Sequence, residues 1–181
     1  MNTQIEAAKI ITSYQPRPAD AARLAEFGAR TFFESFAAEN TAEDMKRHLD
    51  EAWSPEKQLA ELQNPDIETV VLVDGADQWL GFAQLRANQL SEGVPVQGSI
   101  ELWRFYVDKP HHGRGVAQLL MIAAKQQARA RGASSMWLGV WERNERAKAF
   151  YAKHAFRKVG QKVFVVGSDP QTDHVMLCSL A

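Results

Sequence analysis

The segment "HHGRGVAQLL", residues 111–120, places glycine and positive charge where an apolar, strand-like run gives way to a helical pattern. A helix N-terminus offers N–H groups without intrahelical partners and the positive end of the helix dipole, so it favours an anion. Arg114, Lys109 and the two histidines add positive charge, and Gly115 has no Cβ to keep an anion from the backbone. The segment predicts an anion-binding loop.

Two common phosphate-binding motifs do not match this loop. A Walker loop needs Gly-Lys followed by Ser or Thr, which the segment lacks. A dinucleotide fingerprint needs a third glycine where Gln118 stands, and it starts almost directly after its strand, whereas five residues separate Val107 from Gly113. Glu142 could still mimic the ribose-binding acid of that fingerprint, and an ordinary glycine turn with solvated charges is the remaining alternative.

Three further residues could do chemistry, and each has a purely structural alternative. Tyr151 lies at helical spacing with Phe150 and His154, which by itself favours core packing of its ring. Asn144 precedes a short helical pattern and can act as its N-cap. Glu101 interrupts the apolar run "SIELWRFYV", where it is either a functional carboxylate or an exposed residue at the start of a strand.

Cysteine and histidine give no indication of a metal site. Cys178 is the only cysteine, and "VMLCSL" is typical of a buried strand, so we expect a small core residue. The histidines are scattered and show no H-E-x-x-H spacing. We therefore expect no bound metal.

Length and charge bound the class of protein. The 181 residues suit one domain over residues 1–181 with a full core. A net charge of −1 argues against nucleic acid as a partner. The start of the chain does not resemble a signal peptide, and no apolar run reaches membrane-spanning length. We expect a soluble, cytoplasmic protein that does not bind membranes.

Periodicity and capping residues predict the elements. Asp20, Thr41 and Ser54 are expected N-caps of three helices in the first third, with Asp44 completing a capping box and Pro55 at a first helical position. Gly132 is the expected C-cap of the helix that follows the loop. We expect helices over 17–36, 41–53, 54–62, 115–132 and 145–155, and strands over 5–14, within 67–88 around an Asp74–Gly75 turn, and over 99–107, 135–141, 156–166 and 174–180, with a turn-rich link at 167–173.

This order of elements is not a regular alternation of strand and helix. A doubly wound parallel sheet is therefore disfavoured. The order favours an α/β protein of the α+β kind, with a mixed, largely antiparallel sheet covered by helices on both faces.

The stretches "ELWRFYVDKPHHGRGVAQLL" and "WERNERAKAFYAKHAFRKVG" together resemble the GNAT superfamily of N-acetyltransferases. The family signature is Gln or Arg, two residues, Gly, one residue, then Gly or Ala; His112, Gly115 and Ala117 stand in its defining places. His112 departs from the usual Gln or Arg. Asn144, Phe150–Tyr151 and Phe156 match the second family motif in order and spacing.

The resemblance implies acetyl-CoA as co-substrate and assigns residues to it. The strands at 99–107 and 135–141 would splay apart, and the backbone of Phe105, Tyr106 and Val107 would pair with the pantetheine arm. Asn144 would also contact this arm or a phosphate. The pyrophosphate would lie against the N–H groups of His112, Gly113, Arg114, Gly115, Val116 and Ala117.

By the same resemblance, Tyr151 would protonate the departing sulfur, and Glu101 would act as general base through water. The implied function is an acyltransferase that acetylates a primary amine by direct attack in a ternary complex. The expectation of a homodimer rests only on the resemblance to this family.

A softer resemblance, in residues 31–62 and 167–180, points to bacterial spermidine/spermine-type N-acetyltransferases and thus to a polyamine or other small amine. An acidic set in these helices would suit a polycation; its members are Glu34, Glu39, Glu43, Asp44, Asp50 and Glu51. The alternatives are acetylation of a peptide or protein α-amine, an amino acid or an amine drug, and a non-catalytic regulatory acyl-CoA-binding module.

Overall fold

The computed structural model describes residues 11–95 and 97–180. The helices are α2 (Ala21–Phe36), α3 (Ala42–Ala52), α4 (Pro55–Gln63), α5 (Val116–Ala130) and α6 (Glu145–Lys153). Short 3-10 turns lie at Pro18–Asp20, Ala37–Glu39 and Lys109–His111. The strands are β1 (Thr12–Tyr14), β2 (Ile67–Val73), β3 (Trp79–Arg86), β4 (Ser99–Val107), β5 (Ser135–Trp141), β6 (Arg157–Val166) and β7 (Asp169–Ser179). Most of the strand expected over residues 5–14 lies outside the described residues.

Most of the predicted helix caps are present. Thr41 accepts a hydrogen bond from the Asp44 amide, and Ser54 accepts one from the Lys57 amide, each at 3.1 Å. Gly132 adopts a φ of +78° just beyond α5. Asp20 stands at the N-cap position of α2, as expected, but its side chain makes no capping bond there; its carboxylate accepts from the Arg17 amide and caps the preceding 3-10 turn.

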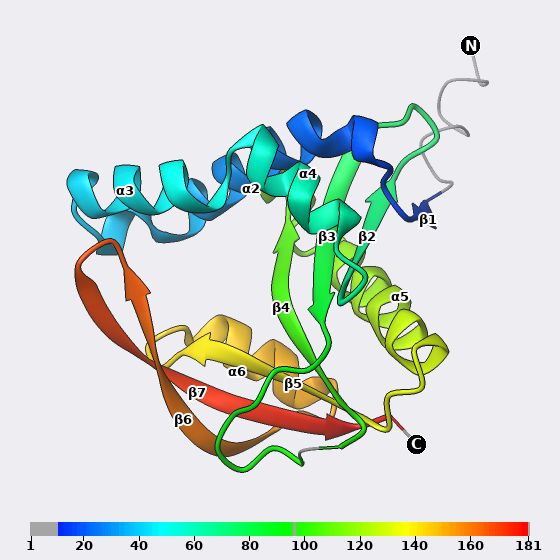
Figure 1. The fold of residues 1–181 in the computed structure, drawn as a ribbon, viewed down its shortest axis with the longest axis vertical. Helices are drawn as coiled ribbons and strands as arrows, with labels where there is room; N and C mark the ends of the chain where they lie inside the picture. Colours follow the sequence, from blue (N-terminus) through cyan, green and yellow to red (C-terminus); the bar gives the residue numbers. More distant parts are fainter. Residues whose placement is uncertain (1–10, 96, 181) are drawn as a thin grey trace.

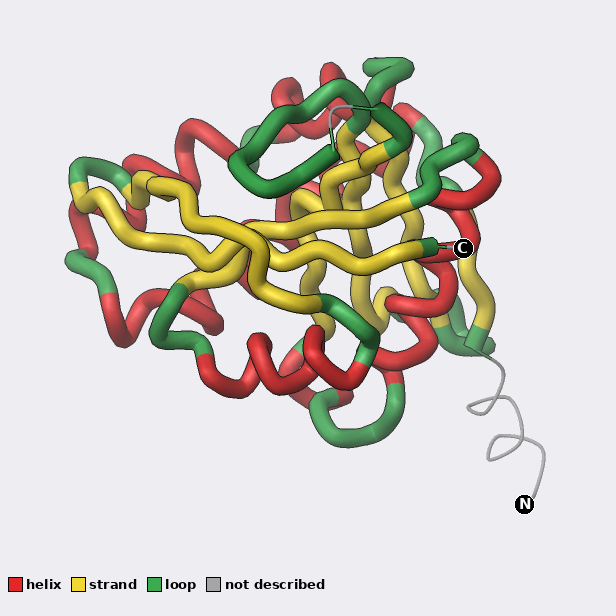
Figure 2. Tube along the Cα trace, turned by 90° about the horizontal axis from the view of Figure 1, so that it is seen from below, coloured by secondary structure: helices red, strands yellow, loops and turns green. Residues whose placement is uncertain are grey.

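The seven described strands form one sheet in the order β1-β2-β3-β4-β5-β7-β6. Every neighbouring pair is antiparallel except β4 and β5, which confirms the mixed, largely antiparallel sheet. Helices cover both faces, as expected (Figures 1 and 2).

Each face of the sheet has its own apolar core. Leu24, Phe32 and Trp53 from the helical first third pack with Phe82 on one face. On the other face α5 contributes residues such as Leu120 to a core that also contains Cys178, which confirms this cysteine as a buried core residue. Because β4 and β5 run parallel, the loop before α5 and the start of α6 lie at the same end of the sheet.

The β6–β7 hairpin differs from expectation. Only Gly167 and Ser168 form the turn, and residues 169–173, expected as part of a turn-rich link, belong to β7. Pairing with the β-branched end of β6 outweighs their turn propensity. Pro170 is tolerated because β7 extends there beyond its pairing with β5 and has β6 as its one described neighbour.

The hairpin tip is fastened to α3. Asp44 Oδ1 accepts hydrogen bonds from the Ser168 amide at 2.7 Å and from its hydroxyl at 2.8 Å. These bonds hold the pKa of the Asp44 carboxyl below its usual value. Figure 1 shows the hairpin reaching from the far end of the sheet to α3.

Within the described residues no helix is long and apolar enough to cross a membrane.

Candidate active site

The sheet opens between β4 and β5. These strands pair in parallel only at Ser99–Ser135, Ile100–Met136 and Glu101–Trp137. Beyond Glu101, β4 continues alongside β3, while β5 continues alongside β7, and the two strands diverge (Figure 1). The expected splayed strand pair is therefore present, and two backbone edges face each other across a gap.

The expected pantetheine-binding residues lie on the β4 side of this gap. The Phe105 ring points toward α6, with its centroid 5.7 Å from that of Phe150. The Tyr106 ring points to the opposite face, 5.6 Å from Phe82. Because side chains of a strand leave through its two faces, the main chain of Phe105, Tyr106 and Val107 forms the edge toward β5.

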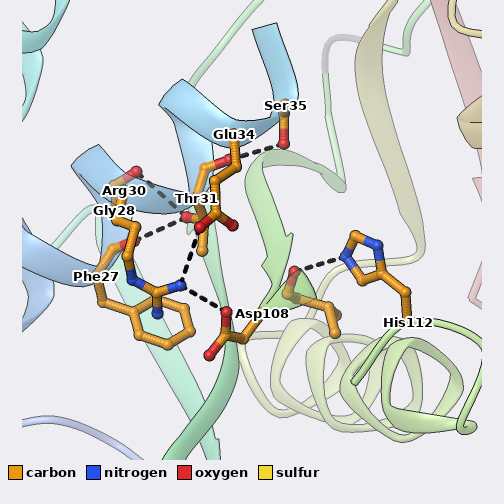
Figure 3. A network of polar contacts seen from close by, with 9 residues as sticks. Phe27, Gly28, Arg30, Thr31, Glu34, Ser35, Asp108 and His112 are labelled. Atoms are coloured by element: carbon orange, nitrogen blue, oxygen red, sulfur yellow. Dashed lines mark hydrogen bonds and ion pairs between the residues drawn. The ribbon is translucent and has the colours of Figure 1, made fainter. Parts of the chain in front are cut away.

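The loop after β4 is held in place by His112. Its Nε2 lies 2.8 Å from the carbonyl oxygen of Val107 and therefore carries the donated hydrogen (Figure 3). His112 thus ties the loop back to the end of the strand. For this nitrogen to donate to a sulfate or phosphate oxygen instead, its bond to the Val107 carbonyl would have to break.

The two loop glycines adopt left-handed backbone. Gly113 has a φ of +75° and Gly115 a φ of +82°, and a Cβ on either would meet nothing within 4 Å. Gly115 is the N-cap residue of α5 and supplies no side-chain cap. The first-turn N–H groups, those of Val116 and Ala117 included, are thus uncapped beside open space, an arrangement that fits a pyrophosphate.

An ion pair fixes α2 against the same end of β4. Arg30 Nη1 lies 2.6 Å from Asp108 Oδ1, immediately after the strand, and 3.5 Å from Glu34 Oε1 (Figure 3). Thr31 donates to the Phe27 carbonyl at 2.8 Å. Helix, strand end and loop therefore form one connected unit.

Tyr151 lies on α6 among aromatic rings. Its ring centroid is 6.2 Å from that of Phe105 and 5.7 Å from that of Phe156. Burial raises the pKa of Tyr151 far above its ordinary value, and the neighbouring Tyr106 adds to this. The phenol therefore stays protonated at neutral pH, and within the described part of the chain its hydroxyl has no hydrogen-bond partner.

Asn144 caps α6, as the sequence predicts. Its Oδ1 accepts from the Ala147 amide at 3.0 Å. The side-chain NH₂ group remains as a donor. One residue can therefore cap the helix and contact a ligand.

Glu101 is fully buried at the point where β4 and β5 part. Its Oε2 accepts from Arg86 at 2.8 Å and 2.6 Å, and its Oε1 lies 3.2 Å from Lys162 Nζ. The alternative of an exposed residue at a strand start is excluded. Both carboxylate oxygens are thus engaged by cationic side chains within the protein.

Two further candidate functional residues, Lys162 and Asp173, were not predicted from the sequence. Lys162 of β6 reaches Glu101, and Asp173 of β7 lies buried on the same face of the sheet. A Cβ on Gly139 would lie 2.9 Å from Asp173 Oδ2 and 3.0 Å from Lys162 Nζ, so this glycine makes room for both side chains. Asp173 was missed because it belongs to the segment "GSDPQTD", whose composition is typical of a turn. Extending the side-chain alternation of "VMLC" toward the N-terminus would have placed Asp173 on this face of the sheet.

The acidic set on the helices is largely engaged within the protein. Glu34, Glu43 and Asp50 each form an ion pair with a basic residue four positions away. Asp44 holds the hairpin. Glu39 and Glu51 have no ion pair among the described residues, and those residues contain no cluster of three or more potential metal ligands.

Comparison with known proteins decides the family. The sequence model of the Acetyltransferase (GNAT) family matches residues 29–156. The chain belongs to the GNAT acetyltransferase family. As a member it is an acetyl-CoA-dependent N-acetyltransferase.

Relatives of this GNAT enzyme agree with the assignment. It is 33% identical over 147 residues to an "Uncharacterized N-acetyltransferase in pepI 3'region" of Lactobacillus delbrueckii subsp. lactis, covering 81% of this chain and 84% of the relative. It is 27% identical over 178 residues to the streptothricin acetyltransferase of Streptomyces lavendulae, covering 91% of each.

Solved structures share the fold. The PaiA N-acetyltransferase of Thermoplasma acidophilum in complex with coenzyme A superposes with a TM-score of 0.76 at 21% identity, over 94% of this chain and 99% of that one. A spermidine N-acetyltransferase SpeG chimera from Vibrio cholerae and hSSAT gives a TM-score of 0.68 at 18% identity, over 94% and 95%.

Proposed function

We propose that this GNAT enzyme acetylates a primary amine of a small molecule by direct attack in a ternary complex with acetyl-CoA. The observation that carries the proposal is the open sheet beside an uncapped helix N-terminus. The β4 edge offers main-chain partners to an extended arm, and the α5 terminus offers N–H groups to the pyrophosphate. Acetyl-CoA supplies an activated acetyl thioester.

In this proposal the loop residues hold the coenzyme. The amides of Gly113, Gly115, Val116 and Ala117 bind the pyrophosphate. Those of His112 and Arg114, also expected to do so, instead donate to the carbonyl oxygens of Lys109 at 3.1 Å and His111 at 3.3 Å. The main chain of Phe105, Tyr106 and Val107 binds the pantetheine arm, and the free NH₂ group of Asn144 adds a donor. Arg114 is exposed and provides positive charge for a further phosphate.

We assign the acid role to Tyr151. Its phenol is protonated at neutral pH, as a tyrosine ordinarily is, and can donate a proton to the leaving sulfur. Burial raises its pKa further, which makes the phenol a weaker acid and the phenolate a stronger base. The base role of Glu101 stays a prediction. Its two ion pairs weigh against it, since Arg86 and Lys162 already engage both carboxylate oxygens.

The best single candidate for the acceptor is a polyamine. Glu39 and Glu51 support a cationic substrate, because they are the members of the acidic set on the helices that neither form an ion pair within the described residues nor hold the hairpin. A second candidate is an amine antibiotic, favoured by similarity to the streptothricin acetyltransferase along most of the chain. A homodimer is a further proposal, tested by light scattering.

The experiment combines calorimetry with a thiol-release assay. Titration with acetyl-CoA should show one site, and an amine panel should then include spermidine, monoamines, a peptide α-amine and streptothricin. Selective release with di- and polyamines supports the polyamine. Thiol release only with the peptide would make a peptide α-amine the acceptor, and release only with streptothricin would make an amine antibiotic the acceptor. Acetyl-CoA binding without thiol release in the presence of any amine would support the non-catalytic regulatory module instead.

A further inference from the structure

Asp173 is a buried carboxylate without a hydrogen bond or ion pair in the described part of the chain. Only 7% of its surface is exposed. It stands opposite Trp141 on β5 and Lys162 on β6. A buried carboxylate normally has partners, because desolvation of a charge is costly. A carboxylate left without them is available to a ligand.

Strand alternation fixes the face on which Asp173 lies. Val175 and Leu177 follow it at a spacing of two and pack with Trp137. Met176 and Cys178 point the other way, into the core beneath α5. Asp173 therefore belongs to the face opposite α5, the same face as the Glu101–Lys162 pair.

The Asp173 side chain reaches over β5, the strand that borders the gap in the sheet, because its Oδ2 lies 2.9 Å from where a Cβ on Gly139 would stand. Its charge is close enough to Tyr106 on β4 to raise the pKa of that phenol, although burial is the larger cause. Tyr106 in turn raises the pKa of Tyr151. Tyr106 is therefore within electrostatic range of both Asp173 and Tyr151.

The two carboxylates on this face differ in their surroundings. Glu101 is held by Arg86 and Lys162. Lys162 attracts the Asp173 carboxylate, but within the described residues no ion pair joins the two side chains. The charged and titratable groups around Asp173 are Lys162 on β6 and Glu101 and Tyr106 on β4, with Arg86 and Arg104 behind them.

We propose that Asp173 is the proton acceptor for the ammonium group of the substrate amine, and that Lys162, positioned by Glu101, keeps Asp173 ionised until the amine binds. This inference rests on the proposed function, because it assumes an amine acceptor. It adds a residue from β7 to the reacting groups.

An Asp173 oxygen takes one proton from R–NH₃⁺, and the freed lone pair forms the N–C bond to the acetyl carbonyl. The C–S bond breaks, Tyr151 gives its proton to the sulfur, and its oxygen takes the second proton from the nitrogen. Asp173 then releases its proton to water, so the products are the acetamide, the thiol of coenzyme A and one proton.

The surroundings of Asp173 suit this step. Burial raises its pKa to about 6, and Lys162 opposes that rise. At neutral pH the carboxylate is therefore mostly ionised and can attract the ammonium. It also holds a proton more readily than an ordinary aspartate does, as a base near operating pH should.

The experiment compares Asp173→Asn with Glu101→Gln and with Asp169→Asn, an exposed control on the same strand. For an alkyl amine at pH 7, Asp173→Asn should lower kcat/KM by roughly 10²–10³-fold, the range of a general base. The loss should shrink as the pH rises and the amine deprotonates in solution. The wild-type acid limb near pH 6 should be absent in this variant and unchanged in Asp169→Asn.

A measurement that does not depend on enzyme activity tests the role of Asp173 separately from the proposed function. In protein with ¹³C-labelled aspartate carboxyls, one signal should titrate near pH 6, and adding amine with coenzyme A should shift it. The signal is assigned to Asp173 if it is absent from the spectrum of Asp173→Asn. If that variant does not fold, Asp173→Glu serves the same purpose.

Three outcomes overturn the assignment. The first is an acid limb that persists in Asp173→Asn and disappears in Glu101→Gln. The second is an Asp173 signal that does not respond to amine. The third is a wild-type enzyme that binds acetyl-CoA but releases no thiol with any amine, which overturns the proposed function as well.

Discussion

The Tyr151 ring meets the Phe105 ring edge-on, with centroids 6.2 Å apart and planes at 69°. The ring therefore packs independently of its hydroxyl. Tyr151→Phe should keep the packing and remove the proton donor, so kcat should fall by roughly 10²–10³-fold. Acetyl-CoA affinity should change little, because proton transfer contributes only after the ground state. Stopped assays and calorimetry on the one variant measure both.

Tyr14→Phe is the matched control for that prediction. The Tyr14 hydroxyl accepts from Trp79 Nε1 at 3.0 Å, far from the gap in the sheet. Its removal should cost about 1 kcal/mol of stability and leave kcat unchanged. A Tyr151→Phe variant that behaves like this control, with normal kcat and a lower Tm, would make Tyr151 a packing residue.

Gly115→Glu should abolish acetyl-CoA binding in a folded protein. The new carboxylate would project into the open space beside the α5 N-terminus and repel the phosphates. Gly132→Glu is a matched control, because Gly132 flanks the same helix at a φ of +78° and also has open space at its Cβ. Both variants should lose ~1 kcal/mol or more from left-handed strain, but only the first should lose binding. Equal acetyl-CoA affinity in both would reject the loop as the phosphate site.

Asp173→Asn should stabilise the protein at neutral pH. Burial raises the folded-state pKa of Asp173 from 3.8 to about 6, so between these values the folded state binds more protons than the unfolded state, and stability falls as pH rises. The ionised carboxylate then costs ~3 kcal/mol above pH 6, at about 1.36 kcal/mol per pKa unit. Urea unfolding should show the variant more stable at pH 7.5 and equal to wild type below pH 4. A variant no more stable at pH 7.5 contradicts this.

Glu101→Gln should act through structure. Removing the charge leaves Arg86 and Lys162 without their shared partner, but both are partly exposed and can reach water, so the cost should be roughly 1–3 kcal/mol. Its turnover loss should be similar at pH 7 and pH 10. A loss that disappears at pH 10 for an alkyl amine would restore Glu101 as the base.

A polyamine acceptor should bind through exposed charge. Spermidine turnover should lose efficiency as salt rises, and Glu39→Gln should raise its KM more than that of a monoamine. Glu43→Gln is the control, since Glu43 already pairs with Arg47 at 3.4 Å. Indistinguishable KM values for spermidine in the two variants would argue against the helices as the acceptor surface.

The local features of this fold could be predicted from sequence, and the long-range ones could not. Thr41, Ser54, Asn144 and Gly132 act within a few residues of themselves, so their caps follow from residue type and spacing. The partners of Glu101 lie 15 and 61 residues away, and only the sheet register brings them together. Asp173 was missed for the same reason, because pairing with β6 outweighs the turn-forming composition around it.

The opening between β4 and β5 separates two kinds of recognition. A strand edge presents the same amides and carbonyls whatever side chains the strand carries. In the proposed function that edge holds the coenzyme, so Phe105 and Tyr106 could be exchanged for other residues during evolution without loss of acetyl-CoA binding. The side chains of the opposite face, including those of the β6–β7 hairpin, are then free to diverge with the acceptor. One cofactor site can in this way persist in lineages whose substrates have little in common.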